Sequence, residues 1–265
     1  MAIALLHIWT HVDRGWFLAV PTIGHGMVYE GTTLGDVLAL DERDGSVRWR
    51  ASLGANPDAT YGSPCGVISS IAVSGGVAYA ASGSCMAAAF NAFYGRLLWK
   101  RRICSIAKND DTYAAPIVAD GRVLLGIDVI ADRPTDVGRE VALDATTGKP
   151  VWSFTPVRYR GTGGGVSATP AFDTSRDVAI IGTGNPTPML DERDGRILWQ
   201  RALEPAMLWT QAIGTPAVAA FDLRTGRLLA QLPVPSELFG HGLALDGDRL
   251  FVAGRGALWA YRLQE

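Results

Sequence analysis

The sequence predicts an all-β fold, a propeller built from four-stranded blades, with residues 1–265 as a single domain. Three observations predict it: a turn motif that recurs along the chain, a Trp that follows the turn at a fixed distance, and no segment with convincing helical periodicity. The hexapeptide LDERDG occurs twice, at residues 40–45 and 190–195, and each copy runs into an apolar stretch that ends in Trp. A structure that uses one turn repeatedly is therefore expected.

Five segments align on this turn. They are VLALDERDGSVRW (37–49), AAAFNAFYGRLLW (87–99), EVALDATTGKPVW (140–152), PMLDERDGRILW (188–199) and VAAFDLRTGRLLA (218–230). Their turn glycines are spaced 50, 53, 47 and 31 residues apart, and in the first four segments Trp comes four residues after the Gly. Periods of this size are typical of propellers, solenoids or arrays.

The pattern inside each segment predicts a β-hairpin. An alternating apolar strand ends at an Asp or Asn, whose side chain can accept hydrogen bonds from the amides of the turn. The Gly supplies the positive φ that a short hairpin loop with a bulge requires. Further strand-like pairs, such as IAVSGGVAYAAS and PIVADGRVLLGI, precede the hairpins and bring the count to four strands per repeat. We interpret Asp41 and Asp191 as turn residues rather than as an acid–base pair.

The recurring Trp suggests how the blades pack. Its ring buries a large apolar area while its indole N–H can reach a neighbour's backbone, so we expect Trp49, Trp99, Trp152 and Trp199 to lie between blades. The N-terminal ALLHIWTHV resembles a Trp strand without its hairpin, and the C-terminal DGDRLFVAGRGALWAYRL lacks such a strand. Both termini are expected to complete one blade, which predicts six blades, with the fifth shortened.

Composition limits the functional classes. A formal net charge of −2 and a pI near 6.1 do not mark the chain as a nucleic-acid binder. No stretch has the length and apolarity of a membrane span, and the N-terminal residues make a poor signal peptide. Cys65, Cys85 and Cys104 permit one disulfide with one free thiol, or three buried thiols. Cys65 and Cys104 flank one blade and are one possible pair.

The segment ALDATTGKPVW matches the repeat of the pyrroloquinoline-quinone (PQQ) propellers, and the likeness covers nearly the whole chain. DDTYAAPIVADGRVLLGI (110–127) and GTGGGVSATPAFDTSRDVAIIGTGNPTP (161–188) are similar, in order, to the quinoprotein alcohol dehydrogenases. In that family the Asn of GTGNP helps to hold Ca²⁺ or a lanthanide beside PQQ. The resemblance therefore implies Asn185 as a metal ligand, with Gly164, Thr183 and Asn185 as cofactor-binding residues.

The resemblance leaves other parts of such a site unmatched. Arg133 stands where the family has a metal-binding Glu, so Asp132 beside it is the candidate carboxylate. The adjacent Cys–Cys pair is absent, and no long insert follows GTGNP to carry a catalytic Asp, so the catalytic residues stay unknown. Two alternatives for the cofactor therefore stay open: PQQ with Ca²⁺, or no cofactor.

Function follows from the site rather than from the fold. We expect a binding scaffold that holds a small molecule in the central funnel or a protein partner, with neither nucleic acid nor a membrane span involved. The alternatives are a PQQ-dependent alcohol or sugar dehydrogenase with divergent ligands, and a propeller recruited to another small-molecule reaction. The resemblance implies an extracytoplasmic location, periplasmic or secreted.

Three further motifs have simpler interpretations. His7 and His11 would share one side of a strand, but two imidazoles make an incomplete metal site, and packing is the better explanation. His25 and His241 each stand in a GHG tripeptide, which indicates turn chemistry. GTGGG (161–165) is expected to be a loop on the propeller face rather than a phosphate-binding loop, because no strand–turn–helix context follows it.

Overall fold

The computed structural model describes residues 4–57, 65–108, 110–129, 137–154, 163–166, 169, 171–173, 178–180, 184–186, 217–221, 228–233, 243–246, 249–254 and 257–264. These residues form antiparallel strands, with one short 3-10 helix, η1 (Ile106–Lys108). The predicted all-β class is confirmed. Within these ranges no helix is both long enough and apolar enough to cross a bilayer.

Strands from the two ends of the chain share one sheet, which we call the terminal sheet. Its order is β1-β23-β22-β21, formed by β1 (Ala4–Val12), β23 (Ala257–Gln264), β22 (Arg249–Gly254) and β21 (Leu243–Asp246). β1 pairs antiparallel with β23 from Ala4 opposite Gln264 to Val12 opposite Ala257, with a bulge between His7 and Trp9. The expectation that the termini complete one blade is confirmed for this sheet.

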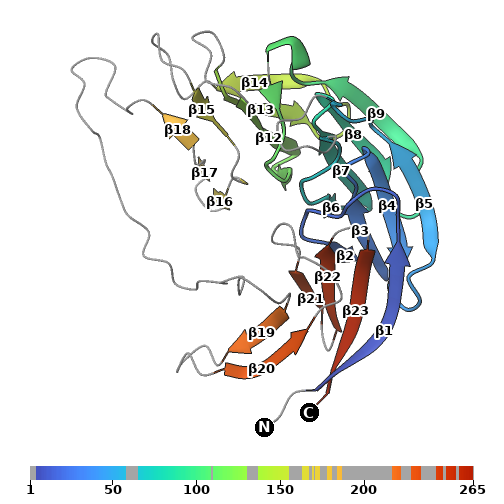
Figure 1. Ribbon diagram of the computed structural model, residues 1–265. Helices are drawn as coiled ribbons and strands as arrows, with labels where there is room; N and C mark the ends of the chain where they lie inside the picture. Colours follow the sequence, from blue (N-terminus) through green and yellow to red (C-terminus); the bar gives the residue numbers. More distant parts are fainter. Residues whose placement is uncertain are drawn as a thin grey trace.

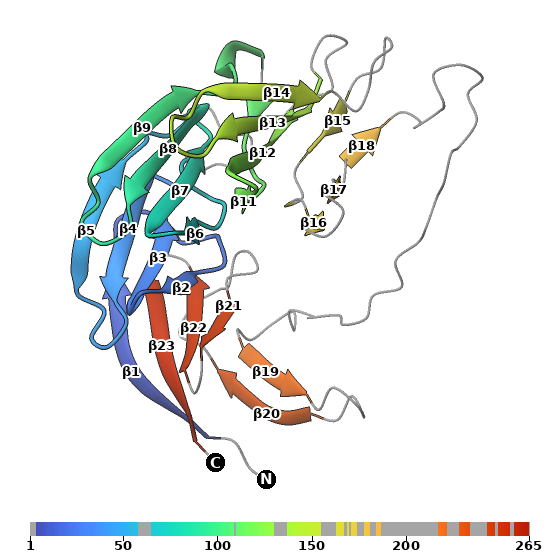
Figure 2. The ribbon, with the colours of Figure 1, turned by 180° about the vertical axis from the view of Figure 1, so that it is seen from behind.

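Three repeat sheets follow along the chain. The first contains β2 (Thr22–Gly24), β3 (Met27–Gly31), β4 (Asp36–Asp41) and β5 (Val47–Ser52). The second contains β6 (Ala72–Ser74), β7 (Val77–Ser82), β8 (Met86–Asn91) and β9 (Leu97–Arg102). The third contains β10 (Asp110–Asp111), β11 (Ile117–Ala119), β12 (Arg122–Val129), β13 (Arg139–Asp144) and β14 (Pro150–Phe154). Figures 1 and 2 show these sheets side by side along an arc, with β5 and β9 on its convex side.

Between residues 163 and 233, the described residues form three two-stranded sheets. These are β15 (Gly163–Gly165) with β18 (Gly184–Pro186), β16 (Ala171–Asp173) with β17 (Val178–Ile180), and β19 (Ala217–Phe221) with β20 (Leu228–Pro233). The second LDERDG motif, Trp199 and Asp191 lie outside the described residues. The six-blade count, the closure of the ring and the shortened fifth blade therefore stay predictions.

A Trp from one sheet packs on the hairpin turn of the next sheet. The Nε1–H groups of Trp9, Trp49 and Trp99 donate to the carbonyl oxygens of Glu42, Ala92 and Ala145 at 3.0, 2.7 and 2.9 Å. Each indole also covers the turn glycine, since an ideal Cβ on Gly45, Gly95 or Gly148 would lie 2.6–2.7 Å from the ring. These three Trp side chains are 5–7% exposed, whereas Trp152 is 39% exposed.

Apolar side chains fill the spaces between successive sheets. Tyr29 and Trp49 of the first repeat sheet pack with Ala78 and Phe90 of the second. A similar cluster joins the second and third repeat sheets, and another joins Trp9 and Phe251 of the terminal sheet to Val28, Leu38 and Leu40. Because side chains alternate across a strand, each four-stranded sheet contributes one face to each of two such layers.

The hairpin turns confirm the predicted role of their polar residues. The Oδ1 atom of Asp41 accepts the amide of Arg43 at 2.8 Å, and that of Asn91 accepts the amide of Tyr94 at 3.0 Å. In the third repeat sheet, Asp144 accepts the amide of Thr147 at 2.7 Å. The carboxylates that resemble a catalytic pair in sequence therefore serve the turns wherever the structure describes them.

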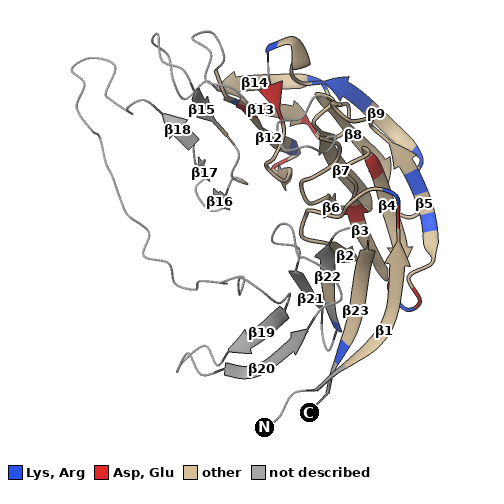
Figure 3. Ribbon diagram, viewed as in Figure 1, with Lys and Arg blue, Asp and Glu red and all other residues tan. Residues whose placement is uncertain are grey.

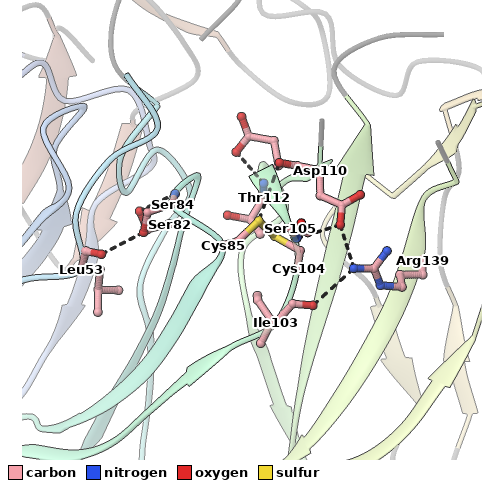
Figure 4. The surroundings of a disulfide bond; sticks show 11 residues. Leu53, Ser82, Ser84, Cys85, Ile103, Cys104, Ser105, Asp110, Thr112 and Arg139 are labelled. Atoms are coloured by element: carbon pink, nitrogen blue, oxygen red, sulfur yellow. Dashed lines mark hydrogen bonds and ion pairs between the residues drawn. A yellow bond between two sulfur atoms is a disulfide. The ribbon is translucent and has the colours of Figure 1, made fainter. Parts of the chain in front are cut away.

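One disulfide joins Cys85 to Cys104 and leaves Cys65 as a buried free thiol. The possible pairing of Cys65 with Cys104 is therefore wrong, because the turn between β7 and β8 brings Cys85, at φ 63°, against the end of β9 instead. Figure 4 shows Arg139 and Asp110 beside this bond; they form an ion pair at 2.9 Å. The Oδ2 atom of Asp110 also accepts the amide of Ser105 at 2.9 Å, which ties the connection between the two sheets.

Candidate functional site

A pocket of about 560 Å³ opens where turns of two sheets meet a strand of a third, and we call it the rim pocket. The β2–β3 turn, the β4–β5 turn, the β8–β9 turn and the start of β22 supply its walls. Its lining residues are His25, Gly26, Met27, Asp41, Glu42, Arg43, Arg48, Phe93, Tyr94 and Arg249. Its volume lies in the range of small-molecule pockets.

The polar wall is built around Asp41. Arg43 binds this carboxylate through Nε and Nη2 at 3.0 and 2.9 Å, and Arg48 binds it through Nε at 3.0 Å. Hydrogen bonds from Arg43, and then from Arg48, hold the pKa of Asp41 far below its ordinary value. Arg249 reaches Glu42 at 2.7 Å, so three guanidinium groups face two carboxylates and the wall keeps an excess positive charge.

The aromatic wall is formed by the β8–β9 turn. Tyr94 is 81% exposed and Phe93 is 43% exposed. The ring centroid of Phe93 lies 4.8 Å from that of His25, which stands in the two-residue β2–β3 turn at φ 56°. Positive φ at both His25 and Gly26 suits a tight hairpin of this kind, and this confirms turn chemistry for the first GHG tripeptide. His241 lies outside the described residues.

The rim pocket was not predicted from the sequence. A signal was present, because the second repeat has AFY between its turn Asn and Gly where the other repeats have ERD, ATT or LRT. Two large aromatic residues in a turn need a reason beyond turn chemistry. The convergence of three sheets on one point could not be read from that signal alone.

The predicted cofactor residues are described only in part. β15 and β18 pair with Gly163 opposite Pro186 and Gly165 opposite Gly184, so the backbones of Gly164 and Asn185 face each other. Thr183 and Asp132 lie outside the described residues. The expectation that GTGGG forms a loop is wrong for Gly163–Gly165, which are a strand. Cofactor binding by Gly164, Thr183 and Asn185 stays a prediction, as does metal binding by Asn185 and Asp132.

Two carboxylates of the described residues, Asp111 and Asp128, lie beside β15. The amide of Val166 donates to the carbonyl of Ile127 at 3.2 Å, which places β15 next to the end of β12, where Asp128 stands opposite Asp111. Burial raises the pKa of both carboxyls above the ordinary value. Within the described ranges, no three His, Cys, Asp or Glu residues are grouped as metal ligands would be.

The histidines of β1 do not share one side of the strand as predicted, because the bulge after His7 shifts the register. His7 bonds the Thr10 hydroxyl at 2.8 Å on the surface. His11 is half-buried 3.6 Å from Asp13, and burial lowers its pKa. Both positions agree with packing roles.

Comparison with known proteins places the chain in a family. A PQQ-repeat family model, described as outer membrane protein assembly factor BamB, matches residues 7–125 and 33–211. The outer membrane protein assembly factor BamB of Moranella endobia (strain PCIT) is 25% identical over 260 residues, which are 92% of this chain. The chain spans 61% of the length of that relative.

Solved structures share the fold. The quinohemoprotein alcohol dehydrogenase ADHIIG from Pseudomonas putida HK5 is similar with a TM-score of 0.63 and 18% identity, over 94% of this chain and 53% of that one. A europium-containing methanol dehydrogenase is similar with a TM-score of 0.60 and 18% identity, over 94% and 49%. The repeated hairpins, the matching family model and these propeller-fold neighbours together show that the chain belongs to the PQQ-repeat propeller family.

Proposed function

We propose that the protein is an extracytoplasmic scaffold that binds another protein through the rim pocket. The observation that carries the proposal is the combination of exposed aromatic rings and arginines at the junction of three sheets. Tyr, Trp and Arg dominate the energetically important positions of protein interfaces, and here Tyr94 stands beside Arg43 and Arg48. The assembly role named for the similar BamB protein agrees with a partner that is a protein.

The pocket walls are held in place, which lowers the entropic cost of binding. Trp9 donates to the carbonyl of Glu42, and Trp49 donates to the carbonyl of Ala92, next to Phe93. Contacts of the kind expected for a tryptophan docking motif thus brace two of the three turns that supply the pocket, the β4–β5 and β8–β9 turns. Preorganised surfaces of this kind suit recognition rather than a mobile catalytic lid.

The disulfide supports the location. Structural disulfides form and persist in oxidising compartments such as the periplasm or the exterior of the cell. Cys85 and Cys104 are both buried and their bond closes the outer end of the second repeat sheet. The disulfide and the family membership both agree with an extracytoplasmic location, which we therefore propose.

Site-specific crosslinking tests the proposal. A photoreactive p-benzoylphenylalanine at position 94, expressed in the source cells, should form a discrete crosslinked protein adduct. The same residue at position 151 is the matched control, because Val151 is 49% exposed on β14 and away from the pocket. Equal adducts from both positions, or none from position 94, would contradict binding at the rim pocket.

A PQQ-dependent dehydrogenase is the second candidate, and the facing backbones of Gly164 and Asn185 favour it. Titration of the purified protein with PQQ and CaCl₂, followed by absorbance, tests it directly. Saturable binding that is lost in Asn185→Ala would support the dehydrogenase candidate. Absence of any PQQ absorbance change would remove it. A small molecule in the central funnel stays a prediction.

A further inference from the structure

The second repeat sheet and its connections lack acidic residues. Residues 59–109 contain no Asp or Glu but five basic residues, in a chain whose formal net charge is −2. The basic residues are Arg96, Lys100, Arg101, Arg102 and Lys108. All five are exposed, and three of them are consecutive in the outer strand β9.

In the neighbouring outer strand β5, by contrast, the arginines have carboxylate partners. Arg48 is paired with Asp41, and Arg50 is paired with Asp36 at 2.5 Å. In the second repeat sheet Asn91, at the end of β8, replaces the turn carboxylate. Among the described residues, Arg101 bonds carbonyl oxygens alone, those of Lys100 and Thr147 at 3.1 and 3.3 Å. In the part of the chain that the structure describes, no carboxylate pairs with any of the five cations. Figure 3 shows the outer strands β5 and β9 side by side, each with blue stretches at its Lys and Arg residues.

β9 also has an open edge. It pairs with β8 on one side, and no described strand pairs with its other side. The amide of Ile103 donates inward to the carbonyl of Cys85 at 2.9 Å. Because backbone groups alternate between the two edges of a strand, the amides of Arg102 and Lys100 point outward. An open edge of this kind can accept an extended peptide.

Apolar side chains extend this edge toward the rim pocket. Leu97 and Leu98 are 51% and 43% exposed, and they follow Phe93 and Tyr94 along the chain. The edge therefore offers backbone groups, apolar contacts and unpaired positive charge in one continuous stretch. Its chemistry is complementary to a strand that alternates apolar and acidic residues.

We propose that the outer edge of β9 docks an extended acidic segment of a partner protein, which adds to the second repeat sheet as a further strand. The inference rests on the proposed protein-binding function and specifies the chemistry of the partner. A protein strand fits better than an anionic membrane surface. Lys100 and Arg102 project from one face of the sheet and Arg101 from the other, so the cations straddle the edge instead of facing one plane.

The test uses defined probes and the full chain. A fluorescent peptide of four Val-Glu repeats should bind the wild-type protein more tightly than a peptide of four Val-Lys repeats, with affinity that falls as salt rises. Lys100→Glu together with Arg102→Glu should weaken binding of the acidic peptide about tenfold or more. Arg14→Glu together with Arg122→Glu is the control with the same change in net charge outside β9, at one exposed and one partly exposed site, and it should bind like the wild type.

Two variants of one residue separate charge from strand addition. Lys100→Gln removes the charge but keeps the outward amide, whereas Lys100→Pro removes both without breaking a bond to β8. The proline variant should bind the acidic peptide more weakly than the glutamine variant, with unfolding midpoints that remain close. Equal binding by the two variants would overturn strand addition.

Further results also bear on the proposed docking at the outer edge of β9. Similar affinity for both peptides, or binding unaffected by the Lys100 and Arg102 reversals, would overturn the proposal. Binding of phosphatidylglycerol vesicles through the same two residues, with no binding of the acidic peptide, would assign this edge to a membrane surface and overturn it as well. A crosslink from position 94 that persists while the peptide fails to bind would leave the rim pocket intact and reject only the edge.

Discussion

The indole N–H of Trp49 donates to the carbonyl oxygen of Ala92, one sheet further along the chain, at 2.7 Å. The ring of Trp49 lies over Gly95 of the same turn, and its own side chain is 7% exposed. One residue of the first repeat sheet thus holds both the apolar layer and the turn of the second. The same relation joins Trp9 to Glu42 and Trp99 to Ala145.

Trp49→Ala should lower the free energy of unfolding by about 3–5 kcal/mol, because it removes a large buried ring and leaves a cavity. Trp152→Ala is the control, since that ring is 39% exposed and its loss should cost about 1 kcal/mol or less. Urea unfolding followed by circular dichroism measures both. Similar losses in the two variants would contradict the packing role of Trp49.

Gly95→Ala should destabilise the protein more than Gly121→Ala. Both glycines have positive φ, 67° and 68°, so both variants carry the strain of an L-residue in that region, about 1–2 kcal/mol. Only at Gly95 would the added Cβ meet Trp49, 2.7 Å from Cγ, while nothing lies within 4 Å at Gly121. The difference in unfolding free energy therefore reports the contact between Trp and turn. Equal destabilisation would show that the indole adjusts without cost.

Removal of the disulfide by Cys85→Ala with Cys104→Ala should cost about 3 kcal/mol, the value for closing a loop of roughly this length. The two cysteines are 19 residues apart in the chain. Thermal unfolding with and without dithiothreitol provides the measurement. The wild type should lose stability in reductant and the double variant should not respond. A wild-type midpoint that is indifferent to reductant would mean that the bond is absent in solution.

Glu140 makes stability fall as the pH rises. Burial raises the pKa of this carboxyl to about 8, and neither oxygen has a hydrogen-bond partner among the described residues. The folded state therefore keeps a proton that the unfolded state releases above about pH 4.5, and the stability difference is lost progressively up to about pH 8. Glu140→Gln should flatten this part of the pH profile and raise stability near its upper end.

Asp120→Asn serves as the control for loss of a carboxylate, because Asp120 is exposed in a turn and its ion pair among the described residues is with Arg122 at 2.9 Å. Unfolding free energies of the three proteins between about pH 5 and about pH 8 provide the comparison. A slope in Glu140→Gln equal to that of the wild type would show that Glu140 is ionised in the folded protein throughout this range.

Local patterns in the sequence predicted much of the fold. Asp41, Asn91 and Asp144 predict turns, because their side chains accept hydrogen bonds from amides only a few residues away. The fixed spacing from the turn Gly to the Trp predicted that each Trp packs between its own sheet and a neighbouring sheet. The pairing of Cys85 with Cys104 could not be predicted, since three cysteines admit several pairings and only the β7–β8 turn selects one.

The candidate site was harder to predict for a physical reason. Its walls come from the terminal sheet and two repeat sheets, and no local pattern encodes where three sheets converge. The resemblance to quinoprotein dehydrogenases instead predicted a cofactor site with Asn185 and Asp132 as metal ligands. The unpaired cations of β9 were visible in the sequence as a run, but their lack of carboxylate partners depends on which strands lie beside them.

The central claim, that the rim pocket binds a partner protein, is tested most directly by one affinity comparison. The partner identified by crosslinking from position 94 is purified and titrated, by calorimetry, against the wild type and against Phe93→Ala with Tyr94→Ala. Loss of two exposed aromatic anchors should weaken binding about thirtyfold or more while the unfolding midpoint stays close to that of the wild type. Affinities that agree within about twofold, well below the effect of a single anchor, would contradict the claim.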